Sequence, residues 1–152
     1  MIAAGPAVRL LDARQGGLDE SGLRGWARSL SDAHPDLTAS RSYRYPYALV
    51  AWHDGPVGVD IERVEACGAS FLESISTPAE RSVEAPPERD PDAHAISLWC
   101  GKEALSKALG DALEYDPRRL ESPLGWPDGR CGPWHAESLS APDGYVAWVC
   151  WR

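Results

Sequence analysis

Residues 47–64 carry the pattern that most restricts the fold of this chain. The apolar run of residues 47–52 is followed by a turn sequence, residues 53–56, that contains a glycine and a proline. In residues 57–64 apolar residues alternate with glycine and with the acids Asp60 and Glu62. Because successive side chains of a strand point to opposite faces, this spacing places both carboxylates on one face. The segment predicts a hairpin of two strands with a pair of acids projecting together.

Helix signals lie on both sides of this hairpin. Thr77, Pro78 and Glu80 form a capping-box sequence, which marks the start of a short helix. A longer helix is expected from about residue 90 to Gly110, and an earlier one from Ser21. The apolar stripe of the longer helix consists of Leu98, Leu105, Ala108, Leu109 and Ala112.

Further strands are expected at both ends of the chain. Residues 7–11 form a short apolar stretch, and residues 134–139 and 145–151 are separated by a turn sequence that contains proline and glycine. Strands and helices therefore alternate irregularly, with hairpins in place of regular crossover units. This order predicts an α+β fold in which an antiparallel sheet is packed with helices.

The charge balance narrows the range of functions. The chain has 152 residues, with 15 lysines and arginines against 23 acids and a net charge of −8. This argues against a protein that binds nucleic acid or an anionic membrane through a general basic surface. The four cysteines form no C-x-x-C pair, no apolar run has the length of a membrane span, and the first residues do not resemble a signal peptide. We expect one soluble, cytoplasmic domain that is an enzyme or a binding module, without a nucleic-acid or membrane partner.

Three acids and two lysines form the candidate site. If the helix that carries Glu103 packs beside the strand that carries Asp60 and Glu62, three carboxylates converge, in a number and kind that suit Mg²⁺. Lys107 shares a helix face with Glu103, and Lys102 points about a quarter-turn away. Lysines beside a metal-binding acid suit a polyphosphate substrate. Taken singly, each feature is more typical of a solvated strand face or a surface ion pair, and only the combination indicates a site.

Two motifs together resemble those of a known family. The first is Gly-Val-Asp-Ile-Glu at residues 58–62, and the second is Trp-Cys-Gly-Lys-Glu-Ala-Leu-Ser-Lys at residues 99–107. Their combination resembles the strand and helix motifs of the 4′-phosphopantetheinyl transferase superfamily. Residues 76–80 and the closing hairpin at 139–148 are also similar, so the resemblance covers residues 47–151. It implies a 4′-phosphopantetheinyl transferase-like fold.

The resemblance also implies a reaction and assigns roles. Members of the superfamily transfer the phosphopantetheine arm of coenzyme A to a serine of an apo acyl or peptidyl carrier protein and release 3′,5′-ADP. In this chain Asp60, Glu62 and Glu103 would hold Mg²⁺ against the pyrophosphate. Glu103 would also act as general base, Lys107 would neutralise or protonate the leaving phosphate, and Lys102 would contact phosphate oxygens.

The stretch before the first motif departs from the superfamily. Larger members carry Ser-His-Ser there, and its histidine contacts the 3′-phosphate of coenzyme A. Counted without a gap, that position falls on Tyr43, whereas two inserted residues would place Arg41 there, followed by Ser42. Arg41 would bind a phosphate bidentately, Arg44 is a further candidate, and Tyr43 would be a weaker, neutral partner. The same residues also fit an ordinary hairpin entry with packed tyrosines and solvated arginines.

The segment before the first motif is also short. We interpret residues 1–46 as a trimmed N-terminal lobe and residues 47–152 as a C-terminal lobe that carries the metal motifs, within one domain. The Gly-Lys-Pro element of larger members is absent, and the first lysine of the chain is Lys102. Either the trimmed lobe suffices, or a second copy of the chain completes the coenzyme A site.

Two other functions stay open on the sequence alone. A repurposed relative would keep the fold and the acids but act on, or bind, a biosynthetic intermediate or a carrier-tethered substrate in place of coenzyme A. Tyr43, Tyr45 and Tyr47 would then line an apolar pocket. A non-catalytic module would only dock with a synthase.

Overall fold

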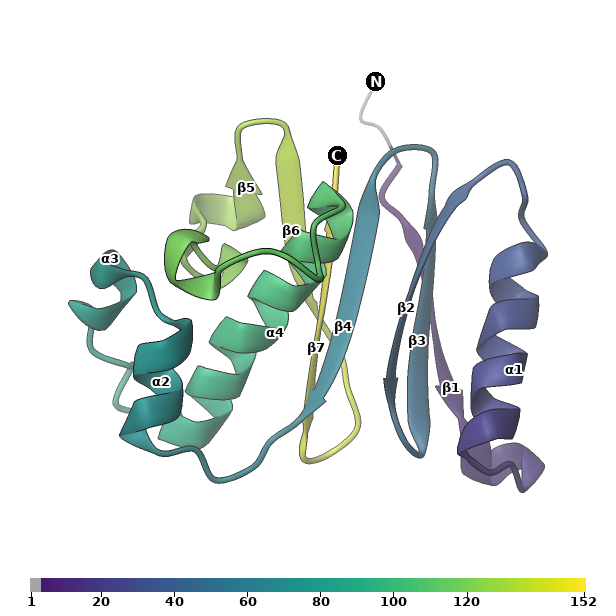
Figure 1. The fold of residues 1–152 in the computed structure, drawn as a ribbon, viewed down its shortest axis with the longest axis horizontal. Helices are drawn as coiled ribbons and strands as arrows, with labels where there is room; N and C mark the ends of the chain where they lie inside the picture. The colour runs from purple at the N-terminus through teal and green to yellow at the C-terminus, as the bar shows by residue number, and fades with distance from the viewer. Residues whose placement is uncertain (1–3) are drawn as a thin grey trace.

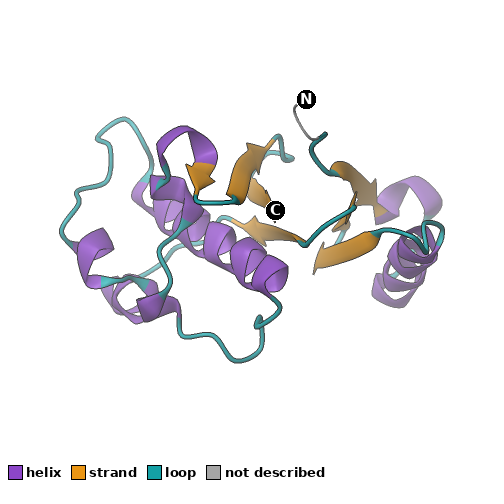
Figure 2. Ribbon diagram, turned by 90° about the horizontal axis from the view of Figure 1, so that it is seen from above, coloured by secondary structure: helices purple, strands orange, loops and turns teal. Residues whose placement is uncertain are grey.

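Two antiparallel sheets and two long helices stack in four layers, helix–sheet–sheet–helix (Figure 1). The structure is a computed structural model that describes residues 4–152. Helix α1 (Glu20–Asp32) covers the outer face of the first sheet, and helix α4 (Pro91–Leu109) covers the outer face of the second. Seen from above, the helices lie at the two ends and the strands in the middle (Figure 2). The α+β expectation is confirmed.

The first sheet has the strand order β1-β3-β2 and is built from β1 (Ala7–Asp12), β2 (Thr38–Arg44) and β3 (Tyr47–His53). Strand β3 pairs with both neighbours, and every residue from 47 to 52 is buried because α1 covers one face of the strand and the second sheet covers the other. The side chain of Asp19 caps α1, whose apolar face packs on β3. The buried cluster of this layer consists of Leu11, Ala13, Leu23, Ala27, Ala48, Val50 and Trp52.

The second sheet has the order β4-β7-β6-β5, with β4 (Val57–Arg63) at its edge. Strand β7 (Tyr145–Trp151) pairs with β4 on one side and β6 (Trp134–Leu139) on the other, and β5 (Arg130–Cys131) closes the far edge. The strands expected at 134–139 and 145–151 are therefore confirmed, together with the hairpin that joins them.

The expected hairpin of residues 47–64 is wrong in its pairing. Both strands exist, but β3 lies in the first sheet and β4 in the second, so the turn between them carries the chain from one sheet to the other. The reason is that β1 and β2 occupy both hydrogen-bonding edges of β3 and leave none for β4. The last strand of the first sheet accordingly ends at His53, and the first strand of the second sheet begins at Val57; residues 1–3 of the expected N-terminal lobe lie outside the described residues.

One apolar core joins the two sheets face to face. It contains buried residues of β3, β4 and β7: Tyr47, Leu49, Ala51, Val57, Val59, Ile61, Ala147 and Val149. The alternation that the sequence shows in residues 57–61 therefore points its apolar side chains at the other sheet, while Asp60 and Glu62 face the opposite way from this core.

Two short helices and several 3-10 turns lie beside α4. Helix α2 (Ala69–Ile75) and helix α3 (Pro78–Arg81) precede it, and the capping box of Thr77 and Glu80 is confirmed at the start of α3. Helix α4 begins after Asp90, whose side chain accepts from the amide of Ala93, and ends at Gly110 with a left-handed φ of 85°. The short 3-10 turns are η1 (Ala13–Gly16), η2 (Pro117–Arg119), η3 (Pro123–Gly125) and η4 (Pro127–Gly129).

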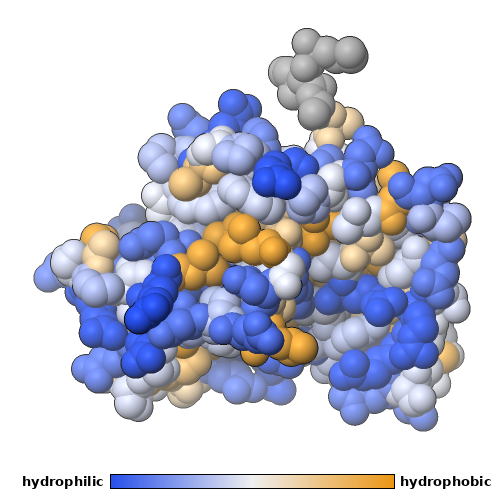
Figure 3. All heavy atoms as spheres, turned by 45° about the horizontal axis from the view of Figure 1, so that its top comes forward, coloured by the Kyte–Doolittle hydropathy of each residue, from blue (hydrophilic) through white to orange (hydrophobic). Residues whose placement is uncertain are grey.

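Hydrophilic residues predominate on the face drawn in Figure 3, with an apolar band crossing its middle. Leu109 belongs to the apolar stripe expected for α4 but is 43% exposed, because the helix ends there. The four cysteines are free thiols. None of the helices within residues 4–152 combines the length and the hydrophobicity that crossing a bilayer requires.

Candidate active site

Two serines of β2 join the edges of the two sheets. The Ser40 hydroxyl accepts from the amide of Val59, and the Ser42 hydroxyl accepts from the amide of Ile61, both at 3.1 Å. Ser42 also donates to Asp60 Oδ1 at 3.0 Å. The hydroxyls take the place that carbonyls of a neighbouring strand would occupy, so β2 and β4 run side by side. Asp60 is thereby held at the junction of the two sheets.

A close approach of α4 to β4 completes this junction. A Cβ atom on Gly58 would lie 2.0 Å from the carbonyl oxygen of Ala104 and 2.6 Å from the amide of Ala108. Only glycine allows the helix to lie so near the strand. The result is that Lys107 reaches over β4: its Nζ donates to the Val59 carbonyl at 2.8 Å and to Asp60 Oδ1 at 3.3 Å.

Asp60 and Glu62 are buried acids with incomplete compensation. Asp60 is 4% exposed, and its Oδ2 has no hydrogen-bond partner among the described residues. Burial raises the pKa of Asp60, opposed in part by Lys107. Burial, reinforced by the charge of Asp60, raises the pKa of Glu62 to about 7. Arg44 opposes this rise, since its guanidinium pairs with Glu62 Oε2 at 2.6 Å. The two carboxylates are thus only partly compensated in a site that is nearly closed to water.

Glu103 lies on the same side of α4 as Lys107 but is held by a residue that the motifs do not contain. The hydroxyl of Tyr115 donates to Glu103 Oε1 at 2.6 Å. Burial raises the pKa of Glu103, while this hydrogen bond and Lys107 oppose the rise. The sequence offered no signal for Tyr115, because the contact depends on how the chain turns back after α4.

The three acids do not form a ready-made metal site. Across residues 4–152, no group of three histidine, cysteine, aspartate or glutamate side chains is placed to hold one ion. Each acid instead accepts from a protein donor: Asp60 from Lys107, Glu62 from Arg44 and Glu103 from Tyr115. The donor set nevertheless fits a hard cation, because the free Oδ2 of Asp60 beside a second buried carboxylate is an uncompensated oxygen ligand.

Lys102, which was expected to contact phosphate, lies away from the acids of β4. Its side chain is fully buried, and Nζ donates to the carbonyl of Ile75, to Glu80 Oε1 at 2.5 Å and to the carbonyl of Pro117 at 2.8 Å. All three protons of the ammonium are used. The quarter-turn that separates Lys102 from Glu103 points it toward α3 and η2, away from β4. Lys102 is a structural cation that ties α4 to Glu80.

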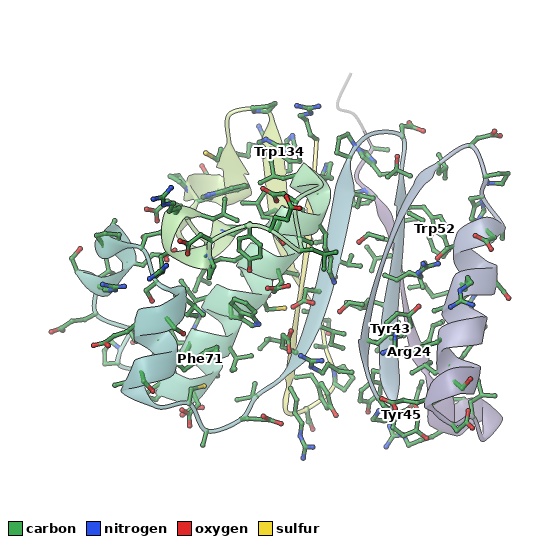
Figure 4. All side chains as sticks on the ribbon, viewed as in Figure 1. Arg24, Tyr43, Tyr45, Trp52, Phe71 and Trp134 are labelled. Carbon is green, nitrogen blue, oxygen red and sulfur yellow. The ribbon has the colours of Figure 1, made fainter. Side chains whose placement is uncertain are left out.

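A cavity of about 610 Å³ opens beside this junction, between the C-terminal end of α1, the strand β2 and Lys107 of α4. Arg41 and Tyr43, which alternate with the serines along β2, both line it. The guanidinium of Arg41 makes no hydrogen bond or ion pair to any described residue, so it is free for a ligand. Arg24 of α1 lies over the Tyr43 ring at 4.4 Å from its centroid (Figure 4).

The other predicted residues of this stretch face elsewhere. Ser42 and Arg44 bond to the acids of β4 and do not line the cavity. The tyrosine-lined pocket of the repurposing hypothesis is not formed: Tyr47 is buried between the sheets, and the Tyr45 hydroxyl donates to the Leu18 carbonyl while its side chain remains exposed.

The fold thus places paired acids on an edge strand under a helix that supplies a glutamate and a lysine. The family model of the 4′-phosphopantetheinyl transferase superfamily matches residues 56–147 of the chain. The match begins just before β4 and ends within β7, and thus includes both motifs. The chain therefore belongs to the 4′-phosphopantetheinyl transferase superfamily. No curated protein matches it.

Proposed function

We propose that this protein transfers the 4′-phosphopantetheine arm of coenzyme A to a serine of an apo acyl or peptidyl carrier protein, with Mg²⁺. The observation that carries the proposal is the junction at Asp60, where β2, β4 and α4 meet and where one carboxylate oxygen has no hydrogen-bond partner among residues 4–152. That junction adjoins the cavity into which Arg41 and Lys107 project. Free carboxylate oxygens next to cations suit a metal-bound diphosphate.

The cavity would receive the nucleotide end of coenzyme A. Arg41 would bind the 3′-phosphate, since a guanidinium offers two parallel donors to a phosphate at any pH. Tyr43 would lie beside it, held by the stacked Arg24. The cavity is lined by α1, β2 and α4 of one chain, so in this proposal the short first lobe suffices and no second copy is needed.

The chain's own residues would support an in-line displacement. The carrier serine oxygen bonds to the phosphorus that bears pantetheine, and the bond from that phosphorus to the bridging oxygen breaks, which releases 3′,5′-ADP. Glu103 would take the serine proton, and Lys107 would neutralise the charge on the departing phosphate. Asp60 and Glu62, with Glu103 nearby, would hold Mg²⁺, which supplies charge stabilisation on the phosphate oxygens when bound.

The biological setting follows from this chemistry. An enzyme that modifies carrier proteins serves a biosynthetic assembly line, including one for natural products, and works where coenzyme A and newly made carriers meet, in the cytoplasm. The repurposed alternative keeps the same acids without coenzyme A. Titration calorimetry with coenzyme A and Mg²⁺ separates the two, because micromolar binding contradicts repurposing.

Intact-protein mass spectrometry tests the reaction itself. The protein is incubated with coenzyme A, Mg²⁺ and a panel of apo acyl and peptidyl carriers, and at least one carrier is expected to gain the phosphopantetheine mass. Asp60→Asn should abolish the gain, whereas Asp143→Asn, an exposed acid of the β6–β7 turn, should not. A panel in which no carrier gains mass contradicts the proposed function.

A further inference from the structure

Three residues of the α4 motif contact one short segment that lies outside both motifs. Trp99 stacks on the Tyr115 ring at 6.4 Å and 28°, Glu103 accepts from the Tyr115 hydroxyl, and Lys102 donates to the carbonyl of Pro117. Trp99 lies three residues before Lys102 and four before Glu103, so it neighbours both along the helix, although Lys102 and Glu103 themselves point about a quarter-turn apart. The segment from Tyr115 to Pro117 is therefore built against the same helix face that presents the glutamate.

We propose that Tyr115 is a positioning residue that fixes one carboxylate oxygen of Glu103 and directs the other toward the reacting groups. The proposal rests on the proposed function, in which Glu103 acts on the carrier serine. A glutamate side chain has three rotatable bonds and, at this partly buried place, needs a partner to keep one orientation. The 2.6 Å bond from Tyr115 supplies that partner at Oε1, and no residue within 4–152 bonds to Oε2.

Tyr115 is itself held from three directions. The amide of Tyr115 donates to the Asp111 carbonyl at 3.0 Å, which closes a turn just after α4. Its ring lies on Trp99, whose other neighbour is Phe71 of α2, at 6.2 Å and 70°. On the far side, the buried Lys102 anchors Pro117 at 2.8 Å. The contacts of the ring and the backbone therefore orient the Tyr115 hydroxyl, and they do not depend on the hydroxyl itself.

This separation makes the proposal testable. Tyr115→Phe removes the hydroxyl and keeps the ring that packs on Trp99, so the fold should persist. A matched control is Tyr45→Phe, which also removes a hydroxyl that donates a 2.8 Å bond, here to the Leu18 carbonyl near the turn between β2 and β3.

The first measurement is carrier loading at varied coenzyme A. Tyr115→Phe should lower kcat by about tenfold or more and leave the KM for coenzyme A within about twofold, because the cavity that binds the nucleotide is untouched. Tyr45→Phe should resemble the unmodified protein. A kcat for Tyr115→Phe within about twofold of the original would overturn the proposal.

The second measurement does not depend on activity. With ¹³C-labelled glutamate, the Glu103 carboxyl resonance is identified by its loss in Glu103→Gln. Tyr115→Phe should shift this resonance and Tyr45→Phe should not; an unchanged resonance in Tyr115→Phe contradicts the positioning role. If no carrier is loaded by the unmodified protein, the proposed reaction fails, and the resonance alone decides whether Tyr115 fixes Glu103.

Discussion

Asp60 and Glu62 are the two residues of the site whose burial is most unfavourable electrostatically. Both are buried on the same face of β4, and their charges are only partly compensated by Lys107 and Arg44. Burying acids in this way is unfavourable for folding, since a neutral residue of the same shape would avoid the desolvation. Their retention on one strand is what a cation-binding function would require.

The pH dependence of stability follows from Glu62. Its pKa is about 7 in the folded chain against an ordinary 4.5, so the folded state binds the extra proton between these values. Stability should therefore fall as pH rises through this window. Glu62→Gln, which stays neutral, should be more stable than the original by on the order of 1–3 kcal/mol at pH 8.5 and nearly equal at pH 4.

Thermal unfolding of both proteins in metal-free buffer checks this prediction. The measurement should use a chelator, because a bound cation would stabilise the ionised form. A difference between the two proteins that is the same at both pH values would contradict the assigned pKa.

In the proposed reaction, Arg41 binds the 3′-phosphate of coenzyme A in the cavity. Arg41→Ala should raise the KM for coenzyme A by about tenfold, because a charge-assisted bidentate contact to phosphate is lost. It should leave the KM for 3′-dephospho-coenzyme A nearly unchanged. Arg28→Ala, an exposed arginine of α1, is the control. Steady-state kinetics with both substrates measure the effect, and equal losses for both would rule out a 3′-phosphate contact at Arg41.

At the scale of elements, the decisive contact is that of α4 with β4. The helix carries Glu103 and Lys107, but only its distance from the strand makes them neighbours of Asp60. Gly58 sets this distance, because any side chain there would meet the backbone of Ala104. The glycine of the first motif is therefore explained by helix packing rather than by a turn.

Gly58→Ala should destabilise the protein by about 1–3 kcal/mol and reduce loading activity, because α4 must shift away from β4. Gly25→Ala is a matched control: Gly25 lies within α1, and an added Cβ there meets nothing within 4 Å. Its helix propensity should make that variant slightly more stable. Denaturant unfolding measures both. Equal stability of Gly58→Ala and the original would contradict the close approach.

The net charge is distributed unevenly between the part of the chain that forms the first sheet and α1 and the part that follows. Residues 1–55 contain six acids and six arginines, so the net charge of −8 belongs entirely to residues 56–152. The cavity lies on the neutral side of the junction, with Arg41 and Lys107 at its wall. The acidic composition therefore excludes a general polyanion-binding surface but leaves room for one local cationic site.

The two sheets are expected to fold together and not separately. Val59, Ile61 and Val149 of the second sheet are buried against Leu49 and Ala51 of the first. Removing residues 1–55 would expose this face, at a cost of roughly 1.5–3 kcal/mol for each large side chain, a sum comparable with the stability of a whole domain. A protein of residues 56–152 should lack a cooperative unfolding transition by near-UV circular dichroism. A sharp transition in that fragment would show an independent lobe.

Local patterns were enough to predict most elements. Caps such as Thr77 with Glu80 and the stop at Gly110 act within a few residues, and strand alternation in residues 57–61 acts along one segment. The site residues Asp60, Glu62, Glu103 and Lys107 came from motifs whose spacing reflects the helix and strand periods. The family assignment follows from those motifs and is confirmed by the family match.

The sequence by itself determined most of the elements and the family and singled out the acids, because these depend on short-range periodicity and on residue type. Only the tertiary structure decided which strands pair, because β3 also pairs with β1 near the start of the chain and β4 pairs with β7 near its end. It also decided that Lys102 is buried and that Tyr115 holds Glu103. Such contacts depend on where separate segments meet in space, and neighbouring residues do not encode that position.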